Sequence, residues 1–217
     1  MAEVEHLHVS YNDVHNIIKD TAGAIVHDFQ PDLLLAIGGG GFFPARVLRT
    51  FIRAQGSHKA IQIQAIGLSL YEPVEGTTAQ QIGTEVIRTQ WLEDAGKNLV
   101  GKKILIVDEV DDTRKTLQYA VSELKKDIAA ELATRPEHEA AVLSTQTAFG
   151  IFVVHNKKKA KIGQLTDDVK YFPGMEVDDV WLDYPWEVLD IEEHDRLVAA
   201  DKARRKARAD QQAAATA

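Results

Sequence analysis

Apolar residues recur along this chain at two spacings, one typical of helices and one typical of buried strands. A helical pattern runs from Val14 to about Phe29, and Ser10 with Asp13 has the spacing of a capping box just before it. Similar helical patterns cover residues 45–53 and 116–132. Short apolar runs that predict strands lie at residues 33–37, 61–66, 86–92, 104–107 and 147–154.

Strand, loop and helix therefore alternate, which predicts an α/β fold with a mainly parallel twisted sheet flanked by helices. Such sheets bind ligands where the carboxyl ends of strands open into loops. Two loops stand at predicted strand ends, Gly38 to Gly41 and Asp108 to Thr116. The apolar pattern disappears at residues 72–85, and a loop of this length is usually functional or mobile. An irregular segment, 171–186, predicts only short strands and turns.

Composition narrows the possible partners. The chain has 217 residues, 33 acidic against 25 basic, and a formal net charge of −8, which argues against nucleic acid or an anionic membrane as the main partner. It has no cysteine, so disulfides, thiolate metal sites and cysteine nucleophiles are excluded. Because no signal-like or membrane-spanning apolar run is present, we expect a cytoplasmic protein.

Four carboxylates gather around the end of the predicted strand 104–107. They belong to Asp108, Glu109, Asp111 and Asp112. The hydroxyls of Thr113 and Thr116 and the amides of a helix start would make an anion site beside them. Carboxylates would repel that anion unless some accept from sugar hydroxyls and a divalent cation neutralises the rest. Capping of the following helix, the simpler interpretation, explains one acid and not four.

This strand, acidic pair and polar turn resemble the signature of the type I phosphoribosyltransferases. With IGGGGFFPAR, SLYE, RTQWL, FVVHNK and WLDYPWE, the sequence is similar to the fungal purine members over residues 9–194. The resemblance implies a domain over 1–198 with a mobile loop at about 70–85. A hood of terminal segments is expected at about 170–195, and residues 199–217 are predicted to be a helical or disordered tail.

The resemblance implies Mg²⁺-dependent transfer of ribose 5-phosphate from phosphoribosyl pyrophosphate to a 6-oxopurine. Asp108 and Glu109 would hold the ribose hydroxyls, and Asp112 would also act as general acid and base at purine N7. The implied ribose- and phosphate-binding set is Asp108, Glu109, Asp111, Asp112, Thr113, Arg114, Lys115 and Thr116. Many relatives have glycine in place of Arg114. If the turn requires a positive φ, Arg114 is strained there; we favour a different turn or an outward-pointing guanidinium.

Pyrophosphate would approach the backbone amides of Gly38, Gly39 and Gly40. Many relatives carry Lys or Arg at the position of Gly39, so neutralisation here would fall to Mg²⁺, Arg46 or the mobile loop. The implied metal-binding residues are Asp108, Glu109 and Glu187. An ordinary strand-to-helix turn is the alternative interpretation of the glycines.

The purine site implied by the resemblance contains Lys157, which would donate to O6, and Trp181, which would stack on the base. The main chain of Leu182 would face the 2-position. Lys158 and Lys159 are adjacent alternatives to Lys157. A core position for Trp181 and a solvated basic run for the lysines are the simpler alternatives.

Ser69, Leu70 and Tyr71 would belong to the mobile loop that closes over the reactants, and Arg88 would reach phosphate. The alternative is a surface loop without a gating role.

We therefore expect a salvage enzyme that makes IMP and GMP from hypoxanthine and guanine, with a xanthine-preferring enzyme as one alternative. Adenine or pyrimidine transfer is disfavoured by Lys157 and Trp181. A non-catalytic nucleotide sensor is the other alternative, but the chain shows no DNA-binding element, and its one basic stretch, 202–208, is short and rich in alanine. A homodimer is expected, with the face near Arg46 and Arg49 as a candidate contact.

Overall fold

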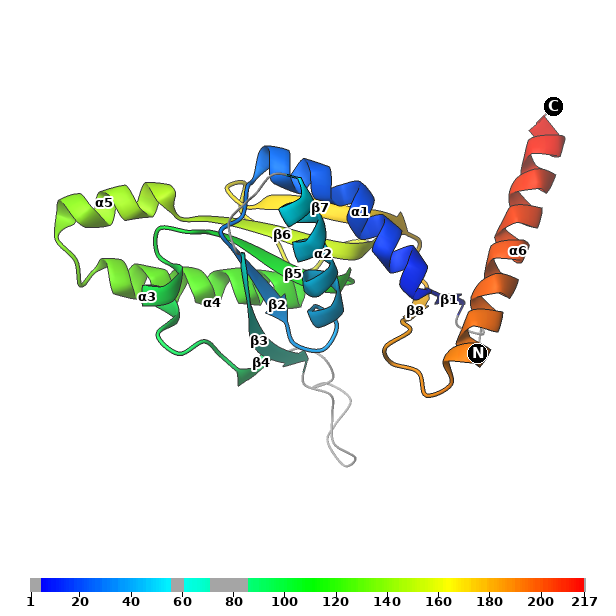
Figure 1. The fold of residues 1–217 in the computed structure, drawn as a ribbon, viewed down its shortest axis with the longest axis horizontal. Helices are drawn as coiled ribbons and strands as arrows, with labels where there is room; N and C mark the ends of the chain where they lie inside the picture. Colours follow the sequence, from blue (N-terminus) through cyan, green and yellow to red (C-terminus); the bar gives the residue numbers. More distant parts are fainter. Residues whose placement is uncertain (1–4, 56–60, 71–85, 217) are drawn as a thin grey trace.

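A computed structural model describes residues 5–55, 61–70 and 86–216. Its centre is a six-stranded sheet with the order β4-β3-β2-β5-β6-β7 (Figure 1). Every neighbouring pair is parallel except β3 and β4. The strands are β2 (Leu33–Ile37), β3 (Gln62–Leu70), β4 (Val86–Gln90), β5 (Lys103–Asp111), β6 (Ala148–Lys157) and β7 (Lys170–Val177). The predicted mainly parallel α/β fold is confirmed.

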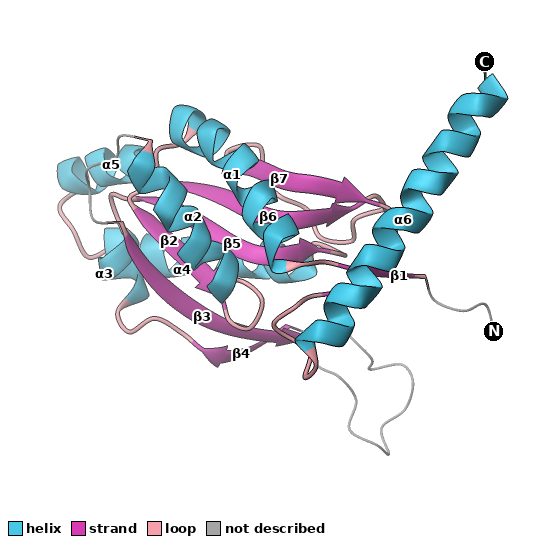
Figure 2. Ribbon diagram, turned by 45° about the vertical axis from the view of Figure 1, so that its right-hand side comes forward, coloured by secondary structure: helices cyan, strands magenta, loops and turns pink. Residues whose placement is uncertain are grey.

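Helices cover both faces of this sheet (Figure 2). On one face lie α1 (Tyr11–Asp28) and α2 (Phe42–Ala54), and on the other lie α3 (Ala95–Leu99) and α4 (Lys115–Leu132). Successive residues of β2 point to opposite faces, so Leu34 packs in the first layer and Leu35 in the second. A further helix, α5 (Glu137–Gln146), follows α4 and buries no residue.

The first residues of α1 and α2 show how far local sequence determines where a helix begins. Ser10 and Asp13 form the predicted capping box, in which the Ser10 hydroxyl accepts from the Asp13 amide at 3.1 Å. The second helix begins at Phe42, earlier than the predicted residue 45, because the turn closes as soon as the Gly41 amide reaches the Ile37 carbonyl at 3.0 Å.

A second, two-stranded sheet joins the two ends of the chain. Strand β1 (His6–His8) pairs in parallel with β8 (Trp181–Asp183), and α6 (Ile191–Thr216) packs on β1 before it projects away from the body (Figure 1). The helix is continuous across residue 198, so the described part of the tail is helical.

Several strand boundaries differ from the predicted ones; β3 ends at Leu70 and not at residue 66, and β4 ends at Gln90 and not at residue 92. Strand β5 continues to Asp111 because it pairs with β6 as far as Asn156, and β6 continues to Lys157 because that residue pairs with Val177 of β7. The acidic residues therefore stand largely on a strand, and Lys157 ends a strand instead of opening a basic loop. Residues 170–177, predicted as hood, form β7 of the central sheet.

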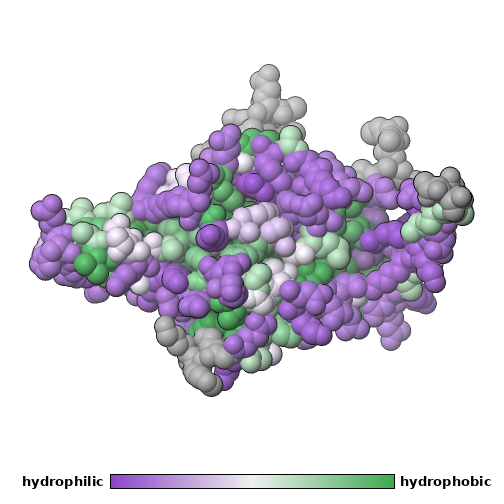
Figure 3. All heavy atoms as spheres, turned by 90° about the horizontal axis from the view of Figure 1, so that it is seen from above, coloured by the Kyte–Doolittle hydropathy of each residue, from purple (hydrophilic) through white to green (hydrophobic). Residues whose placement is uncertain are grey.

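Tyr71 and the predicted loop 72–85 lie outside the described residues, whereas Ser69 and Leu70 end β3. Hydrophilic residues cover most of the face seen in Figure 3, with smaller hydrophobic areas between them. Within the described ranges, no helix has the length and apolarity needed to cross a membrane.

Candidate active site

Glu109, one of the acidic pair near the end of β5, is held by the segment that follows β8. The Trp186 indole donates to the carboxylate of Glu109 at 3.1 Å, and the Tyr184 hydroxyl donates to the Glu109 carbonyl at 3.1 Å. The same carboxylate fills the space beside Gly40, where a Cβ atom would lie 1.8 Å from its carboxyl carbon. Gly40 therefore accommodates Glu109 in this structure.

Negative charge is poorly stabilised at this pair. Burial raises the pKa of Glu109 to about 7, and Glu187 adds to the rise while the Trp186 hydrogen bond opposes it. Burial also raises the pKa of Asp108 well above its ordinary value, with further contributions from Glu109 and Asp111. Hydroxyl donors or a cation at this position would lower the cost of ionisation.

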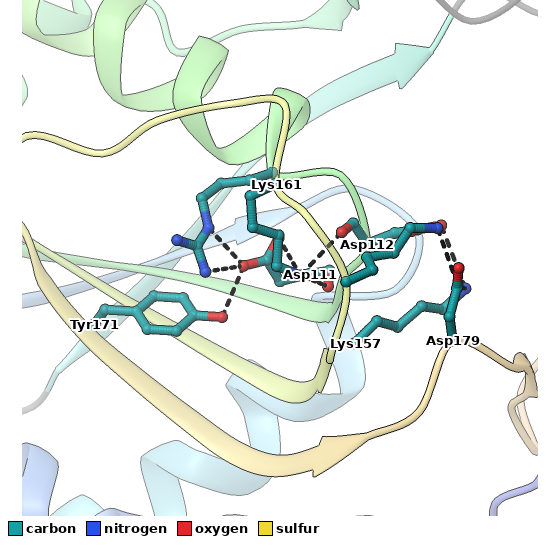
Figure 4. Close-up of polar contacts among 8 residues, drawn as sticks. Asp111, Asp112, Lys157, Lys161, Tyr171 and Asp179 are labelled. Atoms are coloured by element: carbon teal, nitrogen blue, oxygen red, sulfur yellow. Dashed lines mark hydrogen bonds and ion pairs between the residues drawn. The ribbon is translucent and has the colours of Figure 1, made fainter.

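Asp111 occupies the centre of a separate network (Figure 4). Its buried carboxylate accepts from the Arg114 guanidinium at 2.8 Å and from the Tyr171 hydroxyl at 2.7 Å, and the Lys161 Nζ atom lies 3.5 Å away. Its side chain is therefore committed to three protein groups. The predicted contact of Asp111 with the ribose phosphate stays a prediction, and it would have to run through the main chain.

Both favoured forms of the turn at Arg114 are wrong, and the alternative with a positive φ is the one observed. Arg114 adopts a left-handed conformation with φ +68°, and its guanidinium points inward to Asp111 and lies over the Tyr171 ring at 4.7 Å. The ion pair and the ring contact offset a backbone strain of about 1 kcal/mol. The turn leads into α4, and the side chain of Arg114 at the N-cap position makes no capping hydrogen bond; the start of a helix favours an anion. Thr113, Lys115 and Thr116 lie on this turn and first helical residues.

Asp112 forms ion pairs with two lysines, Lys157 at the end of β6 and Lys159 just after that strand. Its carboxylate oxygens are 3.3 Å from Lys157 Nζ and 2.8 Å from Lys159 Nζ. Burial raises the pKa of Asp112, but the two lysines outweigh this effect and leave it below the ordinary value. Asp112 is thus an ionised carboxylate that can accept a proton.

The proposed purine residues come from β6 and β8. Lys157 is buried and also lies 3.9 Å from Asp179, which precedes β8 by two residues. Trp181 is 58% exposed, so the alternative of a core position for it is wrong. Leu182 is buried and packs in the first core layer. The stacking and O6 roles stay predictions.

The glycine turn and Arg46 are both predicted to bind pyrophosphate, and Gly40 of this turn lies close to Glu109. Gly39 has φ +86° and open space around it, whereas the amide of Gly38 donates to the Ile66 carbonyl. The Arg46 guanidinium donates to Thr50 and lines a cavity of about 330 Å³ with Arg49 and other residues of α2.

Arg88 pairs with Glu123 and lies over the Trp91 ring at 4.1 Å, so any reach to phosphate would need it to leave these partners.

Four residues around these groups escaped the sequence reasoning. They are Lys159 as a partner of Asp112, Asp179, Tyr184 and Trp186. The motif WLDYPWE contains the last two, and its second tryptophan, immediately before the predicted metal ligand Glu187, is the signal that could have found the clamp on Glu109. Among the described residues, no group of three or more His, Asp or Glu side chains is arranged to hold a metal ion unaided.

The acidic strand end, the turn into a helix and the lysine-bearing neighbouring strand define a type I phosphoribosyltransferase. A purine phosphoribosyltransferase from Pyrococcus horikoshii has the same fold, with a TM-score of 0.56, 21% identity, and coverage of 86% of this chain and 96% of that one. A hypothetical protein from Neisseria gonorrhoeae with bound ppGpp superposes with a TM-score of 0.72 and 35% identity over 93% of this chain and 99% of that chain.

Curated relatives define the family more closely. The hypoxanthine-guanine phosphoribosyltransferase of Schizosaccharomyces pombe is 52% identical, covering 89% of this chain and 94% of that protein. Xanthine phosphoribosyltransferase 1 of Saccharomyces cerevisiae is 46% identical, covering 92% and 98%. No protein-family model matches the sequence. The chain belongs to the fungal hypoxanthine-guanine and xanthine phosphoribosyltransferases, and the resemblance seen in its sequence is confirmed.

Proposed function

We propose that this protein is a purine salvage enzyme that transfers ribose 5-phosphate from phosphoribosyl pyrophosphate to hypoxanthine or guanine. The products are IMP or GMP and pyrophosphate. Relatives at 52% and 45% identity that carry the hypoxanthine-guanine name support this function. The observation that carries it is the ionised carboxylate of Asp112 placed beside the buried Lys157, because together they match the N7 and O6 edge of a 6-oxopurine.

In the proposed reaction, purine N9 attacks the anomeric carbon, the bond from that carbon to pyrophosphate oxygen breaks, and its electron pair leaves with pyrophosphate. Asp112 takes the proton from N7 as positive charge develops on the purine. Asp108 and Glu109 accept from the ribose hydroxyls, which relieves the repulsion between the two carboxylates. The 5′-phosphate binds at the start of α4, where the helix dipole and the backbone amides favour an anion.

Magnesium is the proposed cofactor. The donor set fits a hard cation, since Asp108, Glu109 and Glu187 offer only carboxylate oxygens and the first two carry raised pKa values. When bound, Mg²⁺ would supply charge neutralisation for the departing pyrophosphate. The protein would contribute one or two carboxylates and phosphoribosyl pyrophosphate the remaining oxygens, which is the usual way that Mg²⁺ binds phosphate substrates.

We also propose a cytoplasmic homodimer. The arginine-lined face of α2, with Arg46 and Arg49, is the proposed contact. Xanthine is a further candidate base, because a relative at 46% identity carries the xanthine name.

The test is release of pyrophosphate from phosphoribosyl pyrophosphate and Mg²⁺ with guanine, hypoxanthine, xanthine or adenine. We expect release with guanine and hypoxanthine and none with adenine. If the protein bound nucleotide but released no pyrophosphate with any 6-oxopurine, the proposed enzyme activity would be wrong and a nucleotide sensor would be the better interpretation.

A further inference from the structure

Lys159 is a charged residue that the proposed reaction leaves without a role. Its Nζ atom lies 2.8 Å from one carboxylate oxygen of Asp112, whereas Lys157 lies 3.3 Å from the other. It also lies 2.9 Å from Asp179, on the connection between β7 and β8. The Asp112 carboxylate therefore ion-pairs with two ammonium groups, and Asp179 lies near both of them, as Figure 4 shows for Lys157.

The three consecutive lysines have different surroundings. The side chain of Lys157 is 10% exposed, that of Lys159 is 30% exposed, and that of Lys158 is 55% exposed. Lys158 lies near Asp178 at 3.6 Å. Strand β6 ends at Lys157, and a tight turn follows in which the Lys159 amide donates to the Lys157 carbonyl at 2.9 Å; from this turn Lys157 and Lys159 both reach Asp112.

The other charged groups near Asp112, Lys161 and Arg114, bind atoms other than its carboxylate oxygens. Lys161 donates to the main-chain carbonyls of Asp111 and Asp112 at 2.7 and 2.9 Å, so it fixes the backbone and not the carboxylate. Arg114 pairs with Asp111. Lys157 and Lys159 are thus the cations, among the described residues, that ion-pair with the Asp112 carboxylate.

The proposed function gives Lys157 a second acceptor, the purine O6 atom. When Lys157 donates to that atom, Asp112 loses part of its stabilisation at the moment when it must be ionised to take the N7 proton. We propose, resting on the proposed function, that Lys159 is a positioning residue that keeps Asp112 oriented and ionised while Lys157 binds the base. Asp179 supports this arrangement because it holds the Lys159 ammonium from the opposite side.

A difference in kinetic effect distinguishes the two lysines. Lys159→Met removes the counter-charge of Asp112 but no contact with the purine, so kcat should fall about tenfold while KM for guanine stays within about twofold. Lys157→Met should instead raise KM for guanine. Lys159→Arg, which keeps the charge, should recover most of kcat. Lys158→Met is the matched control, with the same change on the neighbouring exposed lysine, and should leave both constants unchanged.

The pH profile gives a second readout. Without Lys159 the pKa of Asp112 rises, so the acid limb of kcat should move to higher pH in Lys159→Met and stay in place in Lys158→Met. Carboxyl ¹³C titration of the unliganded protein measures the same pKa without any turnover. The titration separates the inference from the proposed function. If the wild type showed no transferase activity, the proposed function would be wrong, but the titration would still show whether Lys159 lowers the pKa of Asp112.

An Asp112 titration and kcat that are unchanged in Lys159→Met would overturn the inference. A raised KM for guanine with normal kcat would also overturn it, because Lys159 would then bind the base itself.

Discussion

The indole N–H of Trp186 donates to the carboxylate of Glu109 at 3.1 Å, across 77 residues of sequence. Trp186 is itself held by stacking on Tyr184, with centroids 4.8 Å apart, and on Phe43 at 5.4 Å. The Tyr184 hydroxyl donates to the Glu109 carbonyl, so it must accept from Nδ1–H of His155 at 2.8 Å. Burial lowers the pKa of His155 to about 4, which keeps this imidazole neutral. An aromatic clamp thus fixes both ends of Glu109.

Trp186→Phe removes the N–H donor and keeps an aromatic ring. Because Glu109 is the proposed partner of the ribose hydroxyls, we expect KM for phosphoribosyl pyrophosphate to rise about tenfold while KM for guanine changes little. Steady-state kinetics with each substrate varied measures both constants. Trp91→Phe is the matched control, since Trp91 also donates to a carboxylate, Asp127 at 2.7 Å, on the α4 side of the sheet. Equal effects of the two substitutions would count against the clamp.

Gly40→Ala tests the same clamp from its other side. The new Cβ atom would overlap the Glu109 carboxylate, whose flexible side chain can move away without unfolding the protein. We expect a melting temperature within a few degrees of the wild type and a rise of KM for phosphoribosyl pyrophosphate similar to that of Trp186→Phe. The double variant should show little additional effect, because both changes release the same carboxylate. Fully additive effects would mean that Gly40 acts independently.

Asp111→Asn tests the support of the phosphate turn. The change leaves Arg114 and Lys161 facing a neutral group at a buried position, and we expect a loss of about 3 kcal/mol in the free energy of unfolding. Urea denaturation measures it. Asp168→Asn, which loses an exposed partner of Lys125, should cost less than 1 kcal/mol. A similarly small loss in Asp111→Asn would show that the turn does not depend on this network.

The docking of α6 on β1 should depend on pH through Asp201. Burial raises the pKa of this carboxyl, but hydrogen bonds from the His8 amide at 3.0 Å and imidazole at 2.9 Å leave it below the ordinary value. A lowered pKa contributes stability above the unfolded-state value of about 4, and this is lost as pH falls through the folded-state pKa.

The stability difference between wild type and Asp201→Asn should therefore be full near pH 6 and shrink below about pH 4. Thermal melts across this range measure it. Asp210→Asn, an exposed change on the same helix, should give no difference at any pH. A stability difference between wild type and Asp201→Asn that stays constant below pH 4 would contradict the proposed link between the ionisation of Asp201 and stability.

The sequence predicted the strands and helices well where the pattern is local. Strand Leu33–Ile37 is a continuous apolar run, and the Ser10 capping box lies within four residues. Strand β7 was predicted only as part of a segment of short strands and turns, because Pro173 and Gly174 interrupt its pattern. An edge strand tolerates this proline, and the glycine leaves room for Ile17 of α1, so both reasons lie in distant parts of the fold.

The acidic motif predicted where the site lies. The sequence did not predict those contacts of the site whose two residues are far apart in the chain. The left-handed turn at Arg114 could not be read locally, because the ion pair and the tyrosine ring that stabilise it are assembled by tertiary structure. The same holds for Trp186 and Lys159, whose partners are 77 and 47 residues away in the sequence.

Asp112→Asn tests the central claim most directly, because the amide keeps the size of the carboxylate and cannot take the N7 proton. The measurement is single-turnover formation of GMP, together with equilibrium binding of phosphoribosyl pyrophosphate in the presence of Mg²⁺. We expect turnover to fall by about 10² to 10⁴-fold with the dissociation constant of phosphoribosyl pyrophosphate unchanged. Near-normal turnover in this variant would contradict the assignment of Asp112 and the mechanism built on it.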